Sequence, residues 1–224
     1  MSILLAPSSF EFSAIFANIS DWWFLYLILI VSVALVFIAF KYYKFSGALN
    51  VSGTKRLCHI AIFTAICAII NCFSFFPVSY ISISLLATVC MVAGILYGAR
   101  DGFIIGFLGD LIQAIVMPAG AYNPLIGLAS GIMAVIPAIV FNKNTQGIYV
   151  KIAISSLLCL AICTAGLNTF GLWLFYALGK KSFLAYLFIR LPFQILVCAG
   201  NAIVSAIIIK VLMRIFPKKI NENQ

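Results

Sequence analysis

The residues best placed to do chemistry in this chain lie on one predicted helix, between Gly98 and Pro124. At 100° per residue, one narrow arc of this helix collects its small and polar residues, which are Gly102, Gly106, Asp110, Gln113 and Met117. The opposite side is apolar and carries Ile104, Leu108, Leu111, Ile112 and Ile115. Because the neighbouring segments are equally apolar, we expect this side to face lipid and the polar arc to face the protein interior. A carboxylate inside a membrane helix predicts a functional site.

Two further polar sets are predicted near the same, outer end of the protein. One lies late in an apolar segment and contains Asn168, Thr169 and Trp173. The other forms a stripe on the last predicted helix and contains Arg190, Gln194, Asn201 and Ser205. Burying such groups costs several kcal/mol unless they bond to one another or to a ligand. We expect the first two members of this stripe to contact a ligand and the last two to form an interhelical network. For Asp110 two roles stay open: ligand contact, or pairing with Arg190 or a backbone turn.

The chain carries no recognisable catalytic arrangement. It has no Gly-x-Ser-x-Gly or His-Glu-x-x-His motif, and a phosphate-binding loop ending at Lys180 would need a glycine where Leu174 stands. The single histidine, His59, and seven cysteines without a Cys-x-x-Cys pair support no metal site, and the cysteines read as packing residues. We therefore predict no catalytic residue, no metal and no cofactor, and any ATP hydrolysis that powers this protein must occur on another chain.

Composition places the chain in a membrane. Of its 224 residues, 65% are hydrophobic and only 8% are charged, which excludes an ordinary soluble domain. Apolar runs long enough to cross a bilayer predict seven helices, at residues 22–42, 55–73, 82–97, 102–117, 124–141, 148–178 and 183–215. The sixth exceeds one bilayer thickness, and Pro192 should kink the seventh or mark its true start. We expect an extra N-terminal helix and linker (1–50), a helical bundle (51–217) and a cytoplasmic tail (218–224).

The basic residues predict the orientation of these spans. Eleven lysines and arginines fall on one side of the predicted topology, whereas the other side has only Lys180, Lys181 and, near the membrane edge, Arg190. The positive-inside rule then places the N-terminus outside and the C-terminus in the cytoplasm. This clustering at helix ends also explains the net charge of +9 without any nucleic acid.

Small residues predict close helix contacts. Glycines recur four apart at Gly94/Gly98, Gly102/Gly106 and Gly127/Gly131, and we expect them to pack inside the bundle. On the predicted 55–73 helix, one face carries Ala61, Ala65, Ala68 and Cys72. Spacing alone would favour internal packing for these residues too.

Several stretches together resemble the S components, which are the substrate-binding membrane subunits of energy-coupling-factor (ECF) vitamin transporters, and most closely the folate group. The matching stretches span residues 55–214 and are Ala61–Ala65, Leu96–Gly98, Gly109–Leu111, Met117–Tyr122 with Pro124, Leu167–Thr169 and Arg190–Pro192. The resemblance implies a six-helix fold that binds a vitamin near the extracellular side of a bacterial plasma membrane. It also implies partners: a transmembrane coupling subunit, which the Ala61/Ala65 face would contact, and two cytoplasmic ATPases. The leading helix, 22–42, departs from the family pattern.

The candidate ligand site suits an anionic, aromatic molecule. Arg190, with Lys180 and Lys181 nearby, could hold a carboxylate by charge-assisted hydrogen bonds. Trp173, Tyr122 and Tyr80 offer flat surfaces for a ring system, and Asp110 or Gln113 could accept hydrogen bonds from its N–H groups. The predicted substrate-binding residues are Tyr80, Asp110, Gln113, Pro118, Tyr122, Asn168, Trp173, Arg190 and Gln194. The alternatives are another vitamin or a nucleobase-like cargo on the same fold, a stand-alone secondary transporter, or an intramembrane enzyme.

Overall fold

The computed structural model describes residues 53–78, 81–117, 122–141, 147–174 and 182–215. The predicted N-terminal span (22–42), Tyr80, Pro118, Lys180 and Lys181 lie outside these ranges. Within them, the helices are α3 (Thr54–Cys72), α4 (Leu86–Val116), α5 (Pro124–Phe141), α6 (Ile148–Leu158), the π-helical η1 (Cys159–Asn168), α7 (Thr169–Leu172) and α8 (Phe183–Ile215). Two short strands, β1 (Phe75–Val78) and β2 (Ile81–Ile83), pair antiparallel between α3 and α4.

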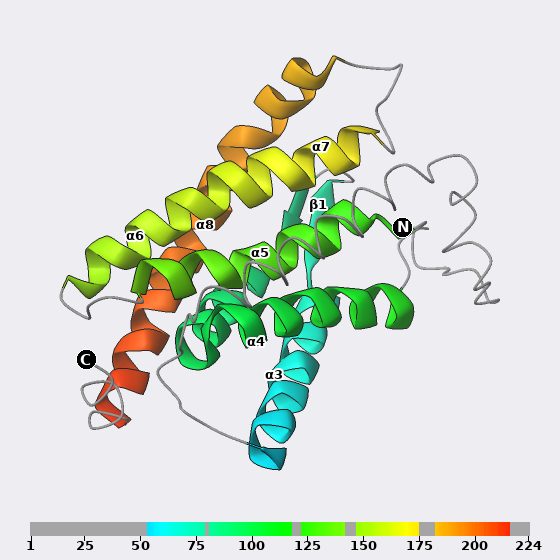
Figure 1. Cartoon of the computed structure of the whole chain (residues 1–224). Helices are drawn as coiled ribbons and strands as arrows, with labels where there is room; N and C mark the ends of the chain where they lie inside the picture. The colour runs from blue at the N-terminus through cyan, green and yellow to red at the C-terminus, as the bar shows by residue number, and fades with distance from the viewer. Residues whose placement is uncertain (1–52, 79–80, 118–121, 142–146, 175–181, 216–224) are drawn as a thin grey trace.

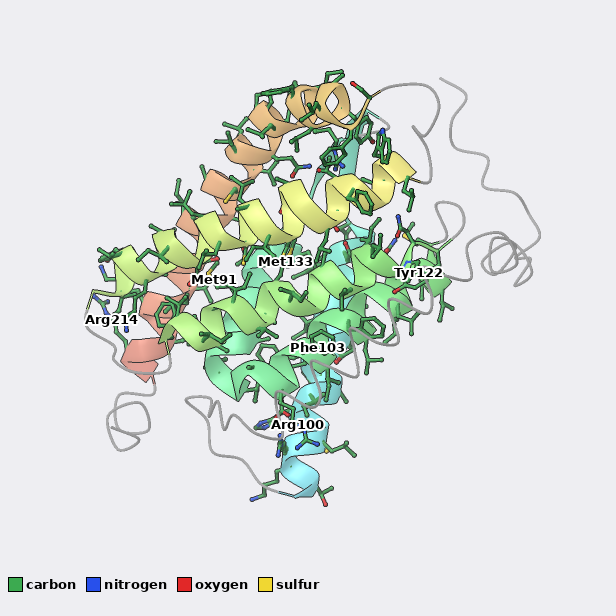
Figure 2. All side chains as sticks on the ribbon, turned by 45° about the horizontal axis from the view of Figure 1, so that its top comes forward. Met91, Arg100, Phe103, Tyr122, Met133 and Arg214 are labelled. Carbon is green, nitrogen blue, oxygen red and sulfur yellow. The ribbon has the colours of Figure 1, made fainter. Side chains whose placement is uncertain are left out.

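Five helical segments are long and apolar enough to cross a membrane, and they pack as one bundle around α4 and α5. In Figure 1, α5 runs between α4 and the continuous α6–η1–α7 segment. Helix α3 packs on α4, and α8 packs on α6 and α4. The side chains of Phe103, Met91 and Met133 point into the interior of this bundle (Figure 2). The apolar surfaces of α3 and α8 remain exposed, as expected for helices that face lipid.

Helix α4 consists of two halves that fold back on each other at Gly98. This glycine has φ 84° and ψ 179°, a conformation that side chains disfavour and glycine permits. A Cβ added to Gly102 would lie 3.0 Å from the Cα of Gly94. In a straight helix, eight residues would separate these glycines by about 12 Å. The sequence predicted two helices, 82–97 and 102–117, and the two halves correspond to them, joined by one glycine and not by a four-residue connection.

The predicted start of the first of these helices, at residue 82, is wrong. Residues Ile81–Ile83 form β2, and the helix begins at Leu86. Ser84 accepts a hydrogen bond at its Oγ from the backbone N–H of Leu86 (3.1 Å), which satisfies one of the free donors at this helix start. The sequence predicts a helix through this stretch, whereas its pairing with β1 depends on the tertiary structure.

Glycines form the contact between α4 and α5, which confirms their predicted packing inside the bundle. Any Cβ at Gly94 would collide with the backbone carbonyl of Ala134, and one at Gly106 would collide with that of Ser130. From the other side, a Cβ at Gly131 would lie 2.7 Å from the ring of Phe103. The absence of side chains at these positions lets the two helices approach backbone to backbone.

The predicted 148–178 helix is described as far as residue 174, and its middle is π-helical. The residues flanking η1 keep right-handed helical angles, so the chain continues through it without a break. Thr169 donates its hydroxyl to the carbonyl of Thr164, five residues earlier (2.8 Å). Pro192 lies inside α8, which starts at Phe183, so it does not mark the true start of the last helix.

Candidate functional site

The polar groups meet where the ends of several helices come together. In Figure 1, the right side of the molecule contains α7, the end of α4 and the start of α5, and α8 begins near α7. Tyr122, at the entry to α5, lies at this edge of the molecule in Figure 2. The polar residues from four segments of the sequence are therefore placed at one end of the bundle.

Asp110 is 5% exposed and joins three helices. Its Oδ1 accepts hydrogen bonds from Asn71 Nδ2 on α3 (3.1 Å) and from Ser130 Oγ on α5 (3.4 Å). Among the described residues Asp110 therefore bonds to Asn71 and Ser130 and not to Arg190, whereas the loop that could supply a backbone turn, residues 118–121, lies outside the described ranges. Its Oδ2 has no hydrogen-bond partner among the described residues. The carboxylate thus keeps one oxygen free of protein donors within the described part of the chain.

Gln113 extends this network toward the end of α4. Its Oε1 accepts a hydrogen bond from Asn71 Nδ2 (3.5 Å), and its Nε2 donates to the carbonyl of Met117 (3.3 Å). Asn71 also accepts, at its backbone oxygen, a bond from the Ser74 hydroxyl (2.6 Å). Met117, predicted on the buried arc, is 54% exposed because the helix has ended at Val116.

Arg190 on α8 is 2% exposed and has only neutral partners among the described residues. Its Nη1 donates to Thr169 Oγ1 on α7 (3.4 Å), and its guanidinium carbon lies 5.6 Å from the ring centroid of Tyr186. Its Nε has no hydrogen-bond partner there. The described ranges contain two carboxylates, of which Asp101 pairs with Arg56 and Asp110 bonds to Asn71 and Ser130. A buried guanidinium without a counter-charge is costly, and it attracts an anion.

Three aromatic rings cluster where α7 meets the start of α8. The ring centroids of Trp173 and Phe183 are 5.8 Å apart in an edge-to-face arrangement, and Phe170 lies 6.1 Å from each of them. Trp173 was predicted to offer a flat surface, and the structure adds Phe170 and Phe183 as its neighbours. Such a cluster supplies a large apolar surface at the same end of the bundle as the polar groups.

The predicted stripe on α8 is buried along its length, but its members differ in their bonding. Asn201 accepts from the Thr88 hydroxyl (2.8 Å) and donates to the carbonyls of Ser84 and Val197 (both 3.0 Å), which confirms its structural role. The Ser205 hydroxyl has no partner among the described residues, so its expected place in that network is wrong. Gln194 is buried one turn beyond Arg190.

Three polar residues of this end were missed at the sequence level: Asn71, Asn123 and Ser130. Asn123 Oδ1 accepts from the backbone N–H of Leu125 (3.1 Å) and so caps α5, a role that the Asn-Pro pair at a helix start could have signalled. Asn71 and Ser130 had no comparable signal, because isolated polar residues in apolar runs gain their meaning from the helix they face.

Ala61 and Ala65 lie on the outer surface of α3 and not in its packed interface. Both are exposed, whereas Ala68 and Cys67 of the same helix are buried against the bundle. Cys67 packs against Gly109 of α4. A Cβ added to Gly109 would lie 2.8 Å from the Cβ of Cys67. The small residues predicted to share one face of this helix are therefore not all buried in the bundle, and Ala61 and Ala65 are available to a partner.

Helices long and apolar enough to cross a membrane, with a polar end that contains a buried cation, indicate an integral membrane protein. The family model for the ECF transporter substrate-specific component matches residues 55–209, and the chain belongs to this family. It is thus a substrate-binding subunit of a transporter and not an enzyme.

Two of the solved structures that share this fold are similar over most of their own length. One is a crystal structure of FolT bound with folic acid, with a TM-score of 0.61 and 17% identity over 68% of this chain and 91% of that chain. The other is the S component of a bacterial ECF transporter, with a TM-score of 0.58 and 20% identity over 72% of this chain and 96% of that chain. At these identities the likeness concerns the fold. No functionally curated protein matches the sequence.

Proposed function

We propose that this protein captures a folate-like vitamin at the extracellular side of a bacterial plasma membrane, as the substrate-specific subunit of an ATP-driven importer. The observation that carries the proposal is Arg190, which is 2% exposed and bonded only to the neutral Thr169 among the described residues. A ligand carboxylate would supply the missing counter-charge through charge-assisted hydrogen bonds. The similarity in fold to a protein solved with folic acid supports the choice of vitamin.

The remaining predicted site residues receive roles that suit such a ligand. Trp173 would contact the ring system together with Phe170 and Phe183, and Asp110 Oδ2 would accept from ring N–H groups. We assign the other contacts to Tyr80, Gln113, Pro118, Tyr122, Asn168 and Gln194. Exposed Ala61 and Ala65 would form the surface for the transmembrane coupling subunit, and two cytoplasmic ATPases would complete the transporter. The charge distribution favours an external N-terminus and a cytoplasmic C-terminus.

The test is ligand identification followed by substitution of Arg190. Native mass spectrometry of the full chain, purified in mild detergent, should show one bound vitamin per protein, and titration with folic acid should give saturable binding. Arg190→Gln should weaken folate binding at least a hundredfold, and Arg190→Lys should restore part of it, because a charge returns without the planar fork. A different bound vitamin would overturn the folate assignment, and no binding to any vitamin would overturn the proposal.

A further inference from the structure

Asn123 carries a buried donor that the described structure leaves unused. Its side chain is 5% exposed, and its Nδ2 has no hydrogen-bond partner among the described residues. The other atom of the same amide, Oδ1, accepts from the backbone N–H of Leu125 at 3.1 Å. Since only the oxygen can accept from an N–H group, this cap fixes which way the amide faces. The two N–H donors of Nδ2 are therefore held in one direction before any ligand arrives.

The Asn123 amide faces α7. A Cβ added to Gly171 would lie 2.9 Å from Asn123 Nδ2 and 3.3 Å from its Oδ1, so the glycine makes room for the amide. One turn earlier on the same segment, Asn168 has a buried Oδ1 without a described partner. Thr169, one of the two residues between them, accepts a hydrogen bond from Arg190, whose Nε likewise has no partner among the described residues. Two donor groups, Asn123 Nδ2 and Arg190 Nε, and one acceptor, Asn168 Oδ1, therefore lie on or beside the segment from Asn168 to Gly171, and none has a described partner.

We infer that Asn123 is a specificity-determining residue that donates from Nδ2 to an acceptor atom on the ring system of the bound vitamin. Asn168 Oδ1 accepts from a neighbouring ring N–H, and Arg190 holds the anionic end. This inference rests on the proposed function and narrows it to heteroaromatic ligands that present a carbonyl or ring nitrogen beside an N–H group. Such a ligand satisfies all three unused groups at once, and an analogue without the acceptor leaves buried donors unpaired.

Asn123→Asp is the decisive variant, because Asp caps helices as well as Asn does while replacing the two donors by an acceptor. Because the added carboxylate is buried, we expect the full-length variant in detergent to fold with a lower thermal midpoint than the ligand-free wild type. Its affinity for folic acid should fall at least thirtyfold. Asn123→Ser keeps a capping oxygen without adding charge, and we expect it to lose at least fivefold.

Ser182→Asp is the matched control. Ser182 is exposed, and its Oγ accepts from the backbone N–H of Ala185 (3.4 Å) at the start of α8. Its substitution therefore adds the same charge at a cap of α8, the helix that carries Arg190, and leaves the Asn123 amide in place, so affinity should stay within threefold. If the wild type binds folic acid and both Asn123 variants bind it within twofold of wild type, the inference is wrong while the proposed function stands. If the wild type binds none of folic acid, riboflavin, thiamine and biotin, both fail.

Discussion

Arg56 and Asp101 form a bidentate ion pair between the first turn of α3 and the residues just past the bend of α4. Nε and Nη2 of the guanidinium lie 2.6 and 2.5 Å from the two carboxylate oxygens. The Asp101 side chain is 6% exposed and the Arg56 side chain 42%. Together with the Asn71–Asp110 bond at the other end of α3, this pair fixes α3 to α4 at both ends.

Removing either partner of this ion pair should destabilise the fold, and the loss should be larger when Arg56 is removed than when Asp101 is. Arg56→Met leaves the Asp101 carboxylate buried without its partner, and we expect a loss of about 2–3 kcal/mol, below the usual range for fully buried pairs because Arg56 is partly exposed. Asp101→Asn, which leaves the more exposed partner, should cost about 1–2 kcal/mol. Thermal unfolding in detergent measures both. The double variant should be more stable than the sum of the single losses implies; strict additivity would show that the two groups do not interact.

Glycine substitutions should separate packed from unpacked positions. Gly106→Ala should lower the thermal midpoint strongly, because its Cβ meets the carbonyl of Ser130. Gly200→Ala is the control, since an added Cβ there meets nothing within 4 Å. Alanine also suits a helix interior better than glycine by roughly 1 kcal/mol, so this variant should be at least as stable as wild type. Equal effects at both positions would contradict the close α4–α5 approach.

Enlarging the exposed alanines should uncouple transport from binding. In Ala61→Trp/Ala65→Trp we expect folate affinity within twofold of wild type but at least tenfold less co-purification with the coupling subunit, because close helix approach needs small side chains. Leu157→Trp, on the exposed surface of α6, adds comparable bulk away from α3 and should preserve assembly. If assembly survives in the double variant, the coupling surface lies elsewhere.

Asp110→Asn tests whether this carboxylate contacts the ligand. The amide oxygen can still accept from Asn71 and Ser130, so the thermal midpoint should change little. The second oxygen becomes a donor, and we expect folate affinity to fall at least tenfold. An affinity within twofold of wild type, in a variant that still folds, would confine Asp110 to joining α3, α4 and α5.

The sequence by itself determined the class of protein and most helix positions. Long apolar runs leave few alternatives to membrane helices, so α3, α5 and α8 begin and end within a few residues of the predicted bounds. Glycines spaced four apart identified the close contacts between α4 and α5. The polar arc of Gly102, Gly106 and Asp110 also proved buried, because helical periodicity fixes which residues share a face.

Only the tertiary structure decided which polar groups are partners. Asp110 bonds to Asn71 and Ser130, and Arg190 to Thr169, although the sequence suggested that the two charges could pair. The β1–β2 pair and the π-helical η1 were likewise not predicted, because their hydrogen bonds depend on segments brought together in space or on a small change of helical pitch. The period of a helix specifies a direction around its own axis, whereas the identity of the neighbour in that direction depends on the packing of the whole bundle.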